Sequence, residues 1–236
     1  MVLNTKKSYG LGCFKKEDNE WKILLVKKRV TYSYISFILS KIPIHKLRYN
    51  LNKMTIDEKL DILSGSYEQM YFRAFLNSQT SSKKFIRLKK SFKEKYLSDD
   101  GVFLKSLITS STNGELLWEI PKGKIRYGET VNECILREFN EEARLKIINS
   151  NISQHFKYNY SYIEDNVNYN ISYKIAVCSK DLKLNQIIQS EISEIKWVPI
   201  KFIDAYNTHN LKVIVKTMIN YIKKHYIKQH NYWAYK

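Results

Sequence analysis

The sequence has few cysteines, few glycines and prolines, and no long apolar run. Its three cysteines, Cys13, Cys134 and Cys178, are far apart along the chain. They therefore favour reduced intracellular thiols over a disulfide framework or a zinc site. No apolar stretch reaches the roughly 18 residues of a membrane-spanning helix, and the first residues lack the apolar core of a signal peptide. The 44% hydrophobic content predicts a globular chain.

Acidic residues are also scarce, with 23 against 40 basic residues and a net charge of +17. Residues 1–30 contribute +5 (8 basic, 3 acidic), residues 31–100 contribute +6 (13 and 7) and residues 201–236 contribute +6 (7 and 1), whereas residues 101–200 hold 12 of each. A cationic surround of this kind steers a polyanionic substrate and neutralises its phosphates. A soluble lysine-rich surface is the alternative.

The densest basic run lies in the first half of the chain. Its seven cations occupy 13 positions: Lys83, Lys84, Arg87, Lys89, Lys90, Lys93 and Lys95. On a helix the interleaved Phe85, Leu88 and Phe92 form one apolar stripe, and the cations cover the rest. The run predicts contact with RNA phosphates, and a solvated helix face is the alternative.

The periodicity of the apolar residues divides the chain into three segments. Residues 1–31 read as a hairpin with a polar KKEDNE turn. Residues 32–105 repeat apolar positions at three and four, which predicts an all-helical insert. Within the insert, Thr55 and Glu58 form a capping box. Residues 106–236 combine strands and helices and complete the domain begun by residues 1–31. We therefore expect an α/β fold, an α/β/α sandwich with a mixed sheet, interrupted by a helical insert domain.

The third segment has a clear order of elements. They are predicted as a strand at 116–120, a helix at 130–143, a hairpin within 155–178, a strand at 194–200, a short helix at 201–207 and a long helix at 211–229.

The helix predicted at 130–143 carries three acidic residues at i, i+3 and i+4. Glu138, Glu141 and Glu142 therefore lie on one helix face. Such carboxylates repel one another unless a hard divalent cation sits between them, and oxygen ligands suit Mg²⁺ or Mn²⁺. The alternative is an ordinary solvated acidic face.

The segment GKIRYGETVNECILREFNEEARL resembles the Nudix box, G-x5-E-x7-R-E-U-x-E-E-x-G-U, in which U is a bulky apolar residue. Eight of the nine fixed positions match: Gly123, Glu129, Arg137, Glu138, Phe139, Glu141, Glu142 and Leu145. Arg144 stands where the family has glycine. Either Arg144 accepts a positive φ at about 1 kcal/mol, or the helix extends past it.

The resemblance implies hydrolysis of a pyrophosphate-type bond, with roles for the matching residues. It implies that Glu138 and Glu142 are the firmest metal ligands, with Glu141 and the Gly123 carbonyl in support. Arg137 and Glu129 would form a buried pair that orients the loop. A further glutamate, Glu191 or Glu194, is a candidate general base.

Other residues near the box have two readings each. Lys122 and Lys124 flank the glycine turn and predict phosphate contacts, although a solvated loop explains them too. Trp118 is either core or a base-stacking residue. The alternating Tyr158, Tyr160, Tyr162 and Tyr169 combine core positions with positions that could stack a base.

WEIPKGK, REFNEEA and the long helical insert look like the mRNA-decapping Nudix enzymes of large cytoplasmic DNA viruses, of the African swine fever virus and giant-virus type. This likeness implies cleavage of capped mRNA to m7GDP and 5′-monophosphate RNA, with Mg²⁺ or Mn²⁺, in the cytoplasm of a host cell. One alternative is a pyrophosphohydrolase acting on diphosphoinositol polyphosphates or nucleoside diphosphate derivatives. Another is a non-catalytic RNA-binding protein on the same scaffold.

Overall fold

The computed structural model describes residues 4–76, 80–145, 147, 151–164, 166–178, 191–206 and 210–233, with side chains up to residue 225. The chain divides into two compact units. The first comprises Met1–Lys27, Trp118–Ile187 and Glu194–Lys236, and the second comprises Lys28–Leu117 and Ile188–Ser193. Among the described residues, no helix has both the length and the hydrophobicity to cross a membrane.

The first unit is built on a mixed sheet. Its strands are β1 (Asn4–Glu17), β2 (Glu20–Lys28), β3 (Trp118–Glu119), β4 (Lys122–Gly123), β5 (Tyr158–Glu164), β6 (Val167–Val177) and β7 (Ile192–Pro199). Their order is β3-β2-β1-β6-β5, with β4 also paired to β1 and β7 to β2. The long β1–β6 pair is parallel, whereas β1–β2, β1–β4, β2–β3 and β5–β6 are antiparallel.

The first hairpin turns more tightly than its sequence predicts. Only Asp18 and Asn19 lie between the strands, with φ of 48° and 61°. Two residues of positive φ are the pattern of a tight hairpin turn whose twist matches its strands, and Asp and Asn tolerate that conformation. The outer residues of KKEDNE therefore continue the strands.

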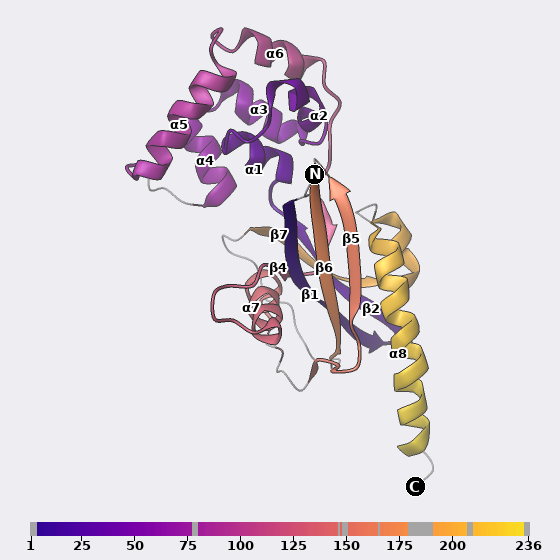
Figure 1. Ribbon diagram of the computed structural model, residues 1–236. Coiled ribbons are helices and arrows are strands. Elements are labelled where there is room, and N and C mark those ends of the chain that lie inside the picture. Colours follow the sequence, from indigo (N-terminus) through magenta and orange to yellow (C-terminus); the bar gives the residue numbers. More distant parts are fainter. Residues whose placement is uncertain are drawn as a thin grey trace. The chain divides into compact units, whose positions relative to one another are not determined.

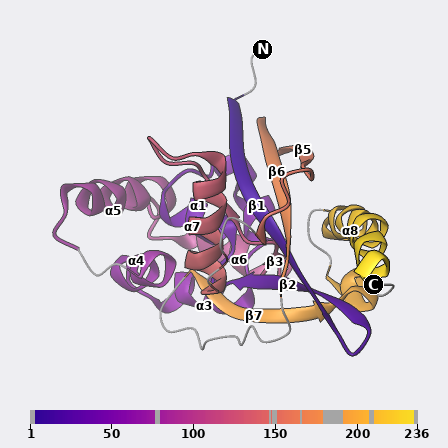
Figure 2. The same cartoon turned by 90° about the horizontal axis from the view of Figure 1, so that it is seen from below.

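Helices cover both faces of the sheet. Helix α7 (Val131–Ala143) lies on one side of β1 and β6, and α8 (Leu211–Trp233) lies on the other (Figures 1 and 2). Beneath α8, buried Phe14, Tyr173 and Met218 belong to one apolar core. The 3-10 helix η3 (Ile200–Ala205) leads toward α8. This arrangement confirms the predicted α/β/α sandwich with a mixed sheet.

The helices of the second unit lie between residues 32 and 109. Its helices are α1 (Tyr32–Ile38), η1 (Ile44–Lys46), α2 (Leu47–Leu51), α3 (Ile56–Ser64), α4 (Tyr67–Phe75), α5 (Lys83–Tyr96) and α6 (Val102–Thr109). They lie in the part of the chain where the apolar residues recur at three and four.

An aromatic core holds these helices together. The Phe37 ring stacks on Tyr96 at 4.6 Å and meets Phe92 edge-on at 5.0 Å. Tyr67 packs against Phe92 at 5.0 Å and against Phe85 at 5.4 Å. The apolar stripe predicted on α5 therefore faces this core, which leaves the opposite face of α5 to its cations.

The predicted capping box of α3 is present and has a second role. Thr55 Oγ1 accepts a hydrogen bond from Glu58 N (3.2 Å), and Glu58 Oε2 accepts one from Thr55 N (3.0 Å). The fully buried Glu58 carboxylate also accepts hydrogen bonds from the backbone and hydroxyl of Thr31, at 2.6 and 2.8 Å. Burial raises the pKa of Glu58. The domain boundaries predicted at 31/32 and 105/106 stay predictions.

Candidate active site

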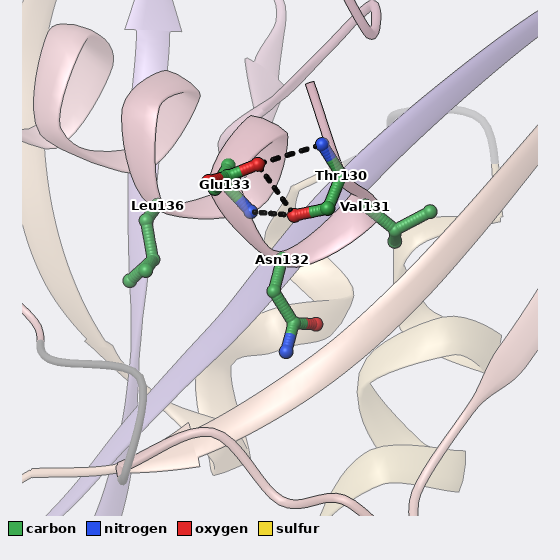
Figure 3. A pocket seen from close by; sticks show the side chains of 5 residues that line it. All are labelled: Thr130, Val131, Asn132, Glu133 and Leu136. Atoms are coloured by element: carbon green, nitrogen blue, oxygen red, sulfur yellow. Dashed lines mark hydrogen bonds between the residues drawn. The ribbon is translucent and has the colours of Figure 1, made fainter. Parts of the chain in front are cut away.

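The helix that carries the acidic residues starts at a strong cap. Thr130 Oγ1 accepts a hydrogen bond from Glu133 N (3.3 Å), and the Glu133 carboxylate accepts one from Thr130 N (2.8 Å) (Figure 3). This reciprocal box fixes the first residue of α7. A hollow of about 570 Å³ beside it is lined by Thr130, Val131, Asn132, Glu133 and Leu136. None of the predicted metal ligands lines that hollow, and we assign it no role.

The Glu138 carboxylate lies directly against the backbone of Gly123. Gly123 pairs with Tyr9 of β1, and a Cβ added to it would lie 1.9 Å from Glu138 Cδ. Any side chain at position 123 would therefore displace the carboxylate. The first position of the box therefore requires glycine, because the Glu138 carboxylate approaches its backbone so closely. The same approach brings the Gly123 backbone near Glu138, a predicted metal ligand.

Arg137 is the centre of an ion-pair network. Its Nε and Nη2 donate to the two Glu129 oxygens at 2.7 and 3.0 Å, and Nη2 also donates to the Lys124 carbonyl oxygen at 2.9 Å. The hydrogen bonds from Arg137 lower the pKa of Glu129 to about 2. This geometry agrees with the orienting role that the resemblance implies, because the pair ties the loop to α7.

Arg137 also contacts the acidic face of α7. Its Nη1 donates to Glu138 at 2.7 Å and to Glu141 at 3.2 Å. Contact with Glu129 first, and also with Glu138, raises the pKa of Arg137 further above its usual range. Arg126 adds a second cation on Glu141, at 3.2 Å. Sequence reasoning missed Arg126, which lies at a variable position of the box pattern.

The three carboxylates differ in burial although they share a helix face. Glu142 is 7% exposed, and its Oε2 accepts a hydrogen bond from Lys122 N at 3.0 Å. The Glu138 side chain is 16% exposed and that of Glu141 is 47% exposed. Within the described residues, no three His, Cys, Asp or Glu side chains form a ready metal cluster. Their roles as metal ligands stay predictions.

The donor chemistry around Gly123 nevertheless fits a hard cation. The Glu138 carboxylate occupies the space that a side chain at Gly123 would fill, and Glu142 is anchored on the adjacent backbone amide. Carboxylate and carbonyl oxygens are ligands that Mg²⁺ and Mn²⁺ accept. The residues present therefore suit a divalent metal.

Arg144, the departure from the box pattern, ends the helix. It adopts φ 52° and ψ 27°, and its amide donates to the Asn140 carbonyl oxygen at 3.0 Å. The helix therefore does not extend past this residue, so that alternative was wrong. The arginine takes up the left-handed conformation for which glycine is favoured, which costs about 1 kcal/mol.

The two lysines beside Gly123 have different environments. Lys122 shares a sheet face with Tyr173, because a Cβ on Gly10 would touch both side chains, and its ammonium pairs with the buried Glu119. Neighbouring strand residues point to opposite faces, so the Lys122 side chain points away from Glu138. Lys124 is exposed. The phosphate contacts of both lysines stay predictions.

The aromatic residues near the site pack mainly against the core of the first unit. Trp118 is partly buried and meets Tyr206 edge-on at 5.6 Å, which agrees with the core reading. Tyr160 and Tyr162 also pack against this core. Tyr162 and Tyr169, partners on β5 and β6, stack at 4.9 Å with a 9° angle between ring planes.

The two candidate bases lie at and before the start of β7. Glu194 forms an ion pair with Lys27 at 3.8 Å. Glu191 is exposed, belongs to the second unit, and accepts a hydrogen bond from Arg29 N through its carbonyl at 2.9 Å. The catalytic role of both glutamates stays a prediction.

The seven cations of α5 divide into two groups. Lys89 forms an ion pair with Glu68, and Lys95 Nζ donates to the Ser40 carbonyl oxygen at 2.9 Å. These two help to hold the helical unit together. The other five are exposed: Lys83, Lys84, Arg87, Lys90 and Lys93. RNA contact by this run stays a prediction.

The fold also brings two of the cysteines together. Cys13 and Cys178 are buried free thiols whose Sγ atoms lie 3.0 Å apart. Their separation in the sequence gave no sign of this contact, which arises because β1 and β6 are parallel neighbours and Cys178 N donates to the Phe14 carbonyl oxygen at 2.8 Å.

Comparison with known proteins supplies the remaining evidence. A family model described as "NUDIX domain" matches residues 98–217. The mRNA-decapping protein g5R of African swine fever virus (isolate Pig/Kenya/KEN-50/1950) is 31% identical over 239 aligned residues, covering 93% of each chain. The protein of the same name from isolate Warthog/Namibia/Wart80/1980 is 30% identical with the same coverage. A solved C. elegans Ap4A hydrolase binary complex is 13% identical with a TM-score of 0.49, covering 94% of this chain and 99% of that one.

The family model covers half of the chain, and the viral relatives extend along nearly all of it. The box residues also occupy the helix, the glycine turn and the arginine network described above. Together these findings show that the chain belongs to the Nudix hydrolase family.

Proposed function

We propose that this protein is a metal-dependent hydrolase that removes the 5′ cap of mRNA and releases m7GDP and 5′-monophosphate RNA. Support comes from relatives named as mRNA-decapping proteins that match over 93% of both chains. The observation that carries the proposal is local: the Glu138 carboxylate lies against Gly123, beside Glu142 on the Lys122 amide. The intact carboxylate set favours an enzyme over a non-catalytic RNA-binding protein.

The proposed cofactor is Mg²⁺ or Mn²⁺. Glu138, Glu142 and the Gly123 carbonyl would hold it, with Glu141 in support. When bound, such an ion neutralises phosphate oxygens and lowers the barrier to attack by water. The choice between the two metals is left to the assay described below.

The chain's own residues position these groups. Arg137 holds Glu138 and Glu129 at once, which keeps the carboxylate of Glu138 beside the glycine turn. The Lys122 amide fixes one Glu142 oxygen. Glu191 and Glu194 are the proposed bases for the attacking water, and Lys124 is the proposed phosphate contact beside the turn.

The exposed face of α5 is the proposed contact for the RNA body. Its five exposed cations lie opposite a stripe that is buried in the core of the second unit, so they remain available for phosphates. The proposed place of action is the cytoplasm of a host cell, because the viral relatives are named as mRNA-decapping proteins.

The test uses three substrates in parallel with either metal. RNA labelled in its cap, free cap dinucleotide and a diphosphoinositol polyphosphate are incubated with the protein and Mg²⁺ or Mn²⁺. The proposal expects release of m7GDP from capped RNA at the highest rate. Preferential cleavage of the diphosphoinositol polyphosphate would replace it with the second candidate, which the high positive charge of the chain also favours.

A further inference from the structure

A hollow in the first unit lies away from the acidic residues of α7. It has a volume of about 490 Å³, within the range of sites that hold a small ligand. Four segments line it: the β1–β2 turn, the start of β2, η3 and α8. The lining residues are Asn19, Glu20, Trp21, Ile200, Lys201, Asp204, Lys216, Ile219 and Lys223.

The charges around this hollow do not cancel. Lys201 pairs with Glu20 at 2.7 Å, and Asp204 pairs with Lys212 at 2.8 Å and only weakly with Lys216 at 3.7 Å. Exposed Lys223 has no ion pair among the described residues. Three lysines and two carboxylates line the hollow, and Lys212 pairs with Asp204 from outside the lining, so the surplus positive charge lies on α8 at Lys216 and Lys223.

Aromatic rings stand beside these cations. Trp21 forms part of the wall and is partly buried against the core. Phe202 follows the lining residue Lys201 in the sequence and is 55% exposed. The Lys201 ammonium lies 5.0 Å from the centre of the Phe202 ring. Cations that contact phosphates, combined with rings on which bases stack, are the features of sites for single-stranded nucleic acid.

We propose that this hollow binds a nucleotide segment of single-stranded RNA, with a base against Trp21 and phosphates on Lys216 and Lys223. The inference rests on the proposed function in that the RNA would be the body of the capped substrate. Lys223 follows Lys216 by seven positions, so their backbones are about 10 Å apart along the helix. That spacing suits successive phosphates of one strand better than the single phosphate group of a mononucleotide.

The experiment compares two double variants of equal charge. Lys216→Gln/Lys223→Gln removes the surplus cations of the hollow. Lys196→Gln/Lys224→Gln removes two exposed cations of the same unit that do not line it. Affinity for an uncapped single-stranded RNA is measured across a salt series, and thermal unfolding checks that each variant is folded. The first variant is expected to weaken binding and to lower the slope of log affinity against log salt by about 1.4, since each lost contact removes about 0.7. The second is expected to keep the wild-type slope.

Two outcomes would overturn the inference. One is a folded Lys216→Gln/Lys223→Gln protein whose salt slope equals that of the wild type. The other is efficient displacement of RNA by AMP from the wild type but not from this variant, which would identify a free-nucleotide site. Failure of the proposed function would give a different result. The wild-type protein would then bind RNA through the hollow but release no m7GDP from capped RNA.

Discussion

Glu142 is the acidic residue whose placement most favours a catalytic role. It is buried, it accepts a hydrogen bond from a backbone amide of the glycine turn, and it lies one turn of helix from Glu138. We expect Glu142→Gln to lower cap hydrolysis by at least about 100-fold, because losing a proposed metal ligand should cost more than the roughly 10- to 100-fold lost with a residue that only supports a ligand. RNA affinity should stay within a few-fold. The measurement is the initial rate of m7GDP release together with RNA binding.

Glu133→Gln is a matched control on the same helix. It removes one carboxylate but keeps the capping box, because the glutamine oxygen can still accept the hydrogen bond from Thr130 N, as Gln69 does in the box of α4. Its hydrolysis rate at 25 °C should remain near that of the wild type. If Glu142→Gln turned over at the wild-type rate in Mn²⁺, the metal-ligand assignment would be wrong.

Glu129 links the arginine network to stability at acid pH. Its pKa is about 2 in the folded protein, against an ordinary value of 4.5, first because Arg137 donates hydrogen bonds to it. A lowered pKa means that the stabilisation is present above pH 4.5 and is lost as the pH falls from 4.5 toward 2. Glu129→Gln should therefore be less stable than the wild type at pH 7, and the difference should shrink below pH 4.5.

Urea unfolding at pH 7, 4.5 and 3 measures this effect. Arg137→Gln serves as the second variant, because it removes the donor and should abolish the same pH dependence. A difference between wild type and Glu129→Gln that stays constant from pH 7 to pH 3 would contradict the account.

At the scale of elements, α5 is the helix whose role can be tested most sharply. We expect Lys83→Gln/Lys90→Gln to flatten the salt dependence of RNA affinity by about 1.4. Both lysines are exposed, and Lys90 is 77% exposed with only a 3.8 Å ion pair to the exposed Glu94 on the same helix. Lys89 is unsuited to the test because its ion pair with Glu68 supports the fold.

The control for α5 is Lys41→Gln/Lys105→Gln, which removes two exposed cations from other segments of the same unit. It should leave the salt slope unchanged. Equal slopes for the two double variants would mean that the basic run of α5 is a solvated helix face.

The elements that the sequence predicted well carry their signals locally. Helix α7 was expected at 130–143 and runs from Val131 to Ala143 behind a Thr130 cap, since capping and periodicity are properties of neighbouring residues. The strand expected at 116–120 is only Trp118–Glu119, because its length depends on its partner β2. The pairing of Arg126 with Glu141 and the Cys13–Cys178 contact depend on tertiary structure, which no local pattern records.

At the scale of the whole molecule, the net charge of +17 lies outside the catalytic box. Residues 101–200 are neutral, and every flanking segment is cationic. If binding energy comes mainly from those segments, affinity should follow the length of the RNA more than the presence of a cap. Long uncapped RNA should then inhibit decapping strongly, whereas free cap analogue should inhibit weakly.

Competition assays with labelled capped RNA measure this balance. Raising the salt from 50 to 200 mM should weaken inhibition by uncapped RNA steeply, because each phosphate contact adds about 0.7 to the slope for a single strand. Inhibition by the small cap analogue should change far less, since it can reach few of the dispersed cations. Strong inhibition by cap analogue, at concentrations where uncapped RNA has no effect, would instead indicate an enzyme whose specificity lies in a pocket for small molecules.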